Sequence, residues 1–124
     1  MLRDSEFYAG IAVDDIDAAR AFYRSTLGLD VRTLDNPMLL ELRGPGARSV
    51  LIYERPNHVP PLHTVLNFPV PDIEAAVDEL TAAGVVFEQY ADGPTKTSEK
   101  GIAHPGPWQA WFRDPAGNIL SVVQ

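Results

Sequence analysis

The sequence predicts an α+β fold in which a single small domain, residues 1–124, is built from two βαβββ modules. The first observation is an internal repeat, because Val13, Asp15 and Ile16 recur 57 residues later as Val70, Asp72 and Ile73. The second is that each copy continues with apolar residues at helical spacing. The third is that strand-forming segments flank both helices. We therefore divide the chain into module one at 5–55, a proline-rich linker at 56–61 and module two at 62–124.

Each predicted helix begins at an aspartate and ends at a glycine. Asp15 and Asp72 can accept hydrogen bonds from the first free N–H groups of a helix. Gly28 and Gly84 can adopt the left-handed conformation that closes one. The apolar faces consist of Ile16, Ala19, Phe22, Tyr23 and Leu27 in the first helix, and of Ile73, Ala76, Val77, Leu80 and Ala83 in the second. Each helix is therefore expected to cover one face of a sheet.

Strands are expected before and after each helix. In module one they are predicted at 6–13, 30–35, 38–43 and 48–54, and in module two at 63–70, 85–90, 107–113 and 118–123. Turn-forming residues at 114–118 separate the last two strands. The irregular stretch 91–106 is interpreted either as a lid over a binding site or as a solvated surface loop.

Composition excludes several kinds of site. The chain has no cysteine, which removes disulfides, thiolate metal sites and thiol nucleophiles. Seventeen acidic and ten basic residues give a net charge of −7, which disfavours a nucleic-acid partner. Apolar runs are far shorter than the roughly 18 residues that cross a membrane, and no signal pattern is apparent. We expect no membrane association and a cytoplasmic location.

The repeated Val-x-Asp pattern, the segment 21–28 and the turn segment 112–118 together resemble the vicinal oxygen chelate superfamily. This superfamily includes glyoxalase I, extradiol dioxygenases and bleomycin resistance proteins. The resemblance covers nearly the whole chain. It implies that the two modules form a curved mixed sheet with a shared cleft, and that a homodimer completes the cleft.

The same resemblance predicts where metal ligands would stand. Metal-dependent members carry a histidine seven residues before each capping aspartate and further ligands on each module's last strand. In this chain these positions hold Tyr8, Val65, Ile52 and Ser121. A catalytic divalent ion needs about three firm nitrogen or oxygen donors. We therefore predict no metal and no cofactor at the family's site.

Two residues could supply a displaced site. His63 and Glu54 lie two positions from Val65 and Ile52, and alternate strand residues share a face. In an apolar cleft, Glu54 would be desolvated and could serve as an acid, a base or an anchor for a cation. The alternatives are a surface histidine for His63, and for Glu54 a rim carboxylate paired with Arg55 or Lys100.

Aromatic and amide side chains on the predicted strands could line the cleft, although core packing is the alternative for each of them. Trp111 and Phe112 must point to opposite faces of their strand, but the sequence does not decide which faces the cleft. No catalytic residue is identified. The candidate ligand-binding residues are Tyr8, Ile52, Glu54, His63, Val65, Asn67, Trp108, Trp111 and Ser121.

Three functions remain open from the sequence. The favoured one is a metal-independent binding protein of the bleomycin-resistance type, which sequesters an antibiotic-like or aromatic small molecule. The second is a glyoxalase- or dioxygenase-like enzyme that uses a displaced metal or acid-base catalysis. The third is an accessory domain whose cleft is filled by its own side chains.

Overall fold

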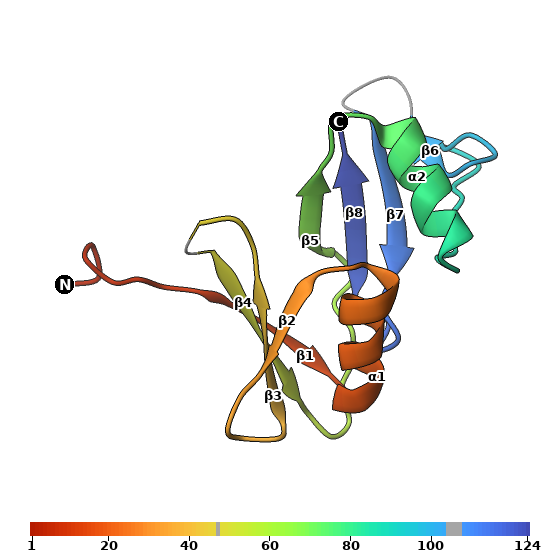
Figure 1. Cartoon of the computed structure of the whole chain (residues 1–124). Coiled ribbons are helices and arrows are strands. Elements are labelled where there is room, and N and C mark those ends of the chain that lie inside the picture. The colour runs from red at the N-terminus through yellow and green to blue at the C-terminus, as the bar shows by residue number, and fades with distance from the viewer. Residues whose placement is uncertain (47, 104–107) are drawn as a thin grey trace. The chain divides into compact units, whose positions relative to one another are not determined.

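The computed structural model describes residues 1–46, 48–103 and 108–124. These residues form two compact units, unit 1 (Met1–His58) and unit 2 (Val59–Gln124), and Figure 1 shows a sheet and a helix in each. None of the helices among the described residues is long and apolar enough to cross a membrane.

Unit 1 contains a mixed four-stranded sheet in the order β1-β4-β3-β2. The first strand, β1, runs parallel to β4, whereas β3 pairs antiparallel with both β4 and β2. Helix α1 continues directly into a π-helical segment, η1. The elements are β1 (Ala9–Val13), α1 (Ile16–Ala21), η1 (Phe22–Thr26), β2 (Asp30–Thr33), β3 (Leu39–Arg43) and β4 (Ser49–Glu54).

Unit 2 repeats this arrangement with the strand order β5-β8-β7-β6. Here β5 is parallel to β8, and β7 is antiparallel to both β8 and β6. The elements are β5 (Thr64–Pro69), α2 (Ile73–Ala82), β6 (Ile102–Ala103), β7 (Gln109–Arg113) and β8 (Ile119–Val123). The predicted α+β fold of two βαβββ modules is confirmed.

Both helices begin at the predicted aspartates. The side chain of Asp15 accepts the N–H groups of Asp17 and Ala18 at 3.0 and 3.1 Å. Asp72 accepts the N–H of Ala75 at 3.1 Å. These bonds satisfy first-turn donors that the helices themselves leave free.

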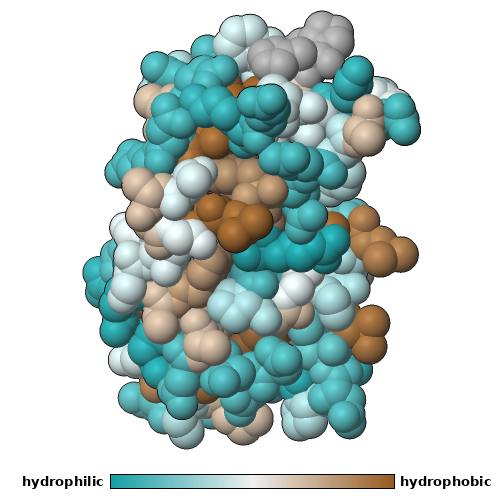
Figure 2. Space-filling view, turned by 90° about the vertical axis from the view of Figure 1, so that its right-hand side faces the viewer, coloured by the Kyte–Doolittle hydropathy of each residue, from teal (hydrophilic) through white to brown (hydrophobic). Residues whose placement is uncertain are grey.

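Each helix covers one face of its own sheet, and we call the other face the helix-free face. Cross-strand partners point to the same side. In unit 1, Ile52 pairs with both Ile11 and Leu40, and all three are buried. In unit 2, Phe112 pairs with Leu120, and both are buried. Hydrophilic residues form much of the surface seen in Figure 2, with smaller hydrophobic areas between them.

The segment predicted as a strand at 85–90 does not form a full strand. Within it, Phe87 makes an isolated bridge to Phe112. The short strand β6 pairs with the next part of β7, at Ala110. The chain between Phe87 and β6 returns tightly against Phe87 at Gly101, which has a φ of 90°. A Cβ atom at this glycine would lie 2.8 Å from the Cβ of Phe87, so only glycine fits.

Candidate functional site

Polar and aromatic side chains meet on the helix-free face of unit 2. Asn67 on β5 and Trp111 on β7 both pair with Ser121 on the central strand β8. Directly paired residues lie on the same face, and so does Gln109, two positions before Trp111. Three strands therefore bring two amides, a hydroxyl and an indole together.

The two amides and the hydroxyl form a hydrogen-bonded cluster. Ser121 Oγ donates to Asn67 Oδ1 at 2.6 Å and accepts from Gln109 Nε2 at 3.0 Å. Gln109 Nε2 also donates to Asn67 Oδ1 at 3.3 Å. Ser121 is fully buried, whereas Asn67 is exposed. A ligand on this face would therefore meet the amides, with Ser121 holding them from beneath.

Trp111 lies in an aromatic pair beside this cluster. Its ring centroid is 5.8 Å from that of Tyr90, at an interplanar angle of 71°. The backbone of Tyr90 is fixed by two bonds to Thr97, through the Thr97 hydroxyl at 2.8 Å and the Thr97 N–H at 2.9 Å. Phe112 is 1% exposed and packs against Phe87. Trp111 therefore belongs to the helix-free face, and Phe112 belongs to the core.

The loop that carries Tyr90 is also tied to α2. Lys100 Nζ lies 2.8 Å from Asp78 Oδ1 and 2.6 Å from Glu74 Oε2. Hydrogen bonds to Asp78 and Glu74 raise the pKa of Lys100 above its usual value, which keeps the ammonium charged. Of the irregular stretch expected at 91–106, residues 104–106 lie outside the described residues.

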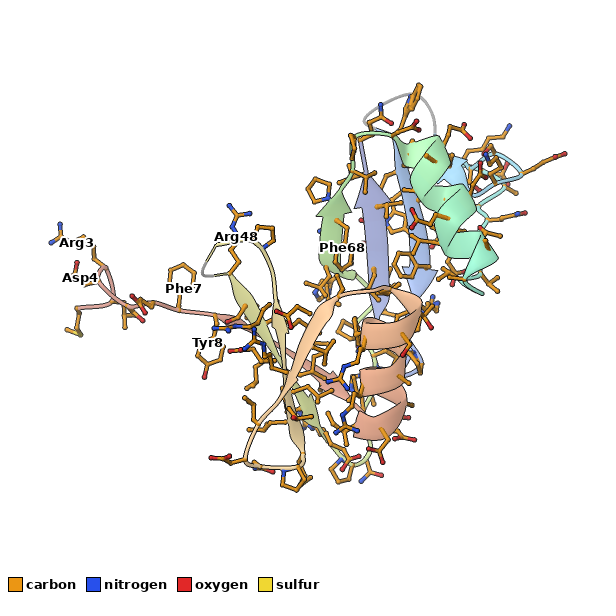
Figure 3. All side chains as sticks on the ribbon, viewed as in Figure 1. Arg3, Asp4, Phe7, Tyr8, Arg48 and Phe68 are labelled. Carbon is orange, nitrogen blue, oxygen red and sulfur yellow. The ribbon has the colours of Figure 1, made fainter. Side chains whose placement is uncertain are left out.

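A hollow of about 240 Å³ lies on the helix-free face of unit 1. Tyr8 is 65% exposed beside it, and Figure 3 shows Phe7 and Tyr8 on the extended segment ahead of β1, with side chains on opposite sides of that segment. Glu41 contributes a carboxylate, and its Oε1 pairs with Arg43 Nε at 3.0 Å. The lining residues are Tyr8, Leu34, Glu41, Ser49 and Leu51.

Two of the expected ligand contacts instead lie on the helix side of unit 1. Ile52 is completely buried, and its neighbour Leu51 faces the hollow. Glu54 has the same strand alternation as Ile52, and its Oε1 accepts the N–H of Ile16 at 3.0 Å. The register of β4 turns both side chains toward α1 and away from the helix-free face.

Replacing Glu54 with alanine is expected to lower the free energy of unfolding by about 0.5–2 kcal/mol, because the first N–H of α1 loses its acceptor. Glu54→Gln keeps an acceptor oxygen and is expected to cost less. Urea unfolding of both variants measures the difference. Equal destabilisation by the two substitutions would show that the hydrogen bond to Ile16 does not stabilise the helix.

Three further candidates lie away from the amide cluster. His63 is exposed and precedes β5. Val65 sits where the β5–β8 register shifts, between Thr64 and Leu66, so the regular alternation of strand faces is interrupted there. Trp108 precedes β7 and is 39% exposed. Sequence reasoning missed Gln109, Tyr90 and Glu41, although alternation within the predicted strands could have suggested Gln109 and Glu41.

The donor chemistry at the family's metal positions does not suit a divalent ion. Val65 has no metal-binding atom, Ile52 is in the core, and Ser121 Oγ donates a hydrogen bond to Asn67. Tyr8 offers only a single phenol oxygen. Within residues 1–46, 48–103 and 108–124, no group of three His, Asp or Glu side chains comes together. The displaced metal site would need Glu54, but its carboxylate accepts the N–H of Ile16 at the start of α1.

Comparison with protein families gives a match over most of the chain. The model of the Glyoxalase/Bleomycin resistance protein/Dioxygenase superfamily matches residues 7–122. A comparison with curated protein sequences gives no match.

Solved structures similar to this chain span nearly its whole length. A glyoxalase family protein from Enterococcus faecalis is 21% identical, with 100% of both chains covered and a TM-score of 0.70. TnmS3, an antibiotic-binding protein from Streptomyces sp. CB03234, is 25% identical over 98% of this chain and 97% of its own, with a TM-score of 0.67. A lactoylglutathione lyase from Agrobacterium tumefaciens is 24% identical over 97% of this chain and 92% of its own, with a TM-score of 0.61.

Proposed function

Because the chain belongs to the Glyoxalase/Bleomycin resistance protein/Dioxygenase superfamily, we propose that it binds a small molecule without a metal ion. The ligand lies on the helix-free face of unit 2. The observation that carries this proposal is the neutral cluster of Asn67, Gln109 and Ser121 beside the Trp111–Tyr90 pair. Flat aromatic surface with a few oriented polar groups is the usual composition of small-molecule sites.

The similarity to TnmS3 supports an antibiotic-like or aromatic compound as the ligand, since that protein is described as antibiotic-binding. Sequestration requires no reacting group, and the cluster offers only amides and a hydroxyl. A homodimer and a cytoplasmic location, both expected from the sequence, remain part of the proposal. Half-buried Trp111 would supply most of the apolar contact with the ligand.

Metal removal tests the proposal directly. The chain has two tryptophans, so a Trp108→Phe variant keeps only Trp111. The fluorescence of Trp111 then reports binding at the proposed site. The probe is isoquinoline, a flat bicyclic compound that is neutral at pH 8. Protein purified without chelator should contain far less than one metal ion per chain, and its affinity for isoquinoline should not change after EDTA treatment and dialysis.

Two results would contradict the proposal. One is iron, manganese, zinc or nickel bound at about one ion per chain, with binding of the probe lost when that ion is removed. The other is the absence of any Trp111 response to isoquinoline or its derivatives. A matched Trp111→Phe variant keeps Trp108 as the reporter, and its response should be much smaller.

A further inference from the structure

We infer that the ligand of this face is a neutral flat ring that carries a hydrogen-bond donor directly beside an acceptor, as a cyclic lactam does. This inference rests on the proposed function, because it names the ligand class of the same site. It follows from the hydrogen-bonding atoms that the amide cluster leaves over.

A count of donors and acceptors shows which atoms remain. Asn67 Oδ1 accepts from both Ser121 and Gln109, and Gln109 Nε2 donates to both Ser121 and Asn67. A side-chain amide has two donor hydrogens on nitrogen and one acceptor oxygen. The unused groups are therefore Asn67 Nδ2 and Gln109 Oε1, for which the described part of the chain shows no partner.

The unused donor and the unused acceptor lie on two neighbouring amides. The amides that carry them touch at 3.3 Å, and buried Ser121 binds both, which restricts their rotation. In this arrangement Asn67 Nδ2 is the outward donor and Gln109 Oε1 is the outward acceptor. The face therefore offers one donor and one acceptor on neighbouring amides.

A cyclic lactam matches this pair. Its carbonyl accepts from the outward amide N–H, and its neighbouring N–H donates to the outward amide oxygen. The flat ring then lies toward Trp111, which shares the face with the cluster. A charged group finds no counter-charge in the cluster, so a neutral ligand avoids the cost of an unpaired, desolvated ion.

Matched probes test the donor and acceptor separately from the ring. Isoquinolin-1(2H)-one has the flat ring and the lactam, and its N-methyl derivative has lost only the donor. We expect the lactam to bind about tenfold more tightly than the N-methyl compound, because methylation leaves the outward oxygen without a partner. Trp111 fluorescence in the Trp108→Phe variant gives both dissociation constants.

The variant Gln109→Met keeps the length of the side chain and removes its hydrogen-bonding atoms. In this variant the affinities of the two compounds should agree within about twofold, whereas Gln89→Met, which alters a glutamine outside the cluster, should retain the tenfold preference. Thermal unfolding confirms that both variants are folded.

Equal binding of the lactam and its N-methyl derivative to the unaltered protein would overturn the inference and leave the proposed function standing. A preference that survives Gln109→Met would also overturn it. If neither lactam nor isoquinoline changes Trp111 fluorescence, the proposed function fails as well.

Discussion

Replacing Ile52 with alanine is expected to lower the free energy of unfolding by about 2–5 kcal/mol. Ile52 is completely buried between Ile11 and Leu40, its partners on the two neighbouring strands. Truncation removes apolar contacts and leaves a cavity that the surrounding sheet fills only in part. Urea unfolding followed by far-UV circular dichroism measures the loss.

The adjacent residue provides a matched control. Leu51 is only half-buried on the helix-free face and pairs with Gly10 and Glu41. Leu51→Ala should therefore cost clearly less than Ile52→Ala, since less surface is removed from water in the folded state. If Leu51→Ala were the more destabilising change, β4 would present the opposite face to α1.

Local chemistry was sufficient to predict both helices and most of the strands. The repeated aspartates cap both helices, and the apolar residues at helical spacing include Ile16, Ala19 and Tyr23, which are buried. These features depend on residues a few positions apart. The turn at Asp114 is similarly local, because its carboxylate accepts the N–H groups of Ala116 and Asn118.

Strand register was harder to predict because it depends on distant partners. The sequence places Ile52 and Leu51 on opposite faces of β4 but does not say which face α1 covers. A register shift at Val65 has no local signal in the sequence. The expected strand at 85–90 was likewise shortened, because the edge position beside β7 is shared between Phe87 and β6.

The candidate site was predicted only in part, because its residues are also brought together by strand register and by the path of a loop. Asn67, Ser121 and Trp111 were expected to line a binding face, and the structure groups them on one side of the sheet. Whether they contact a ligand stays a prediction. Tyr90 could not be found from the sequence, since its contact with Trp111 depends on the path of the loop after Phe87.

Substitution of Trp111 and Phe112 should separate binding from stability. Phe112 is 1% exposed and packs against Phe87, so Phe112→Ala is expected to cost about 3–5 kcal/mol in the free energy of unfolding. Trp111 is half-buried on the helix-free face. Trp111→Ala should cost much less stability but weaken isoquinoline binding by tenfold or more, because the ring loses its aromatic contact.

Isothermal titration calorimetry with isoquinoline and chemical denaturation of each variant give the two quantities independently. Calorimetry is needed here because Trp111→Ala removes the fluorescent reporter. Tyr90→Ala provides a second test, since Tyr90 contacts Trp111 but lies outside the strands. It should weaken the probe with little loss of stability. Unchanged binding in both Trp111→Ala and Tyr90→Ala would exclude this aromatic pair from the site.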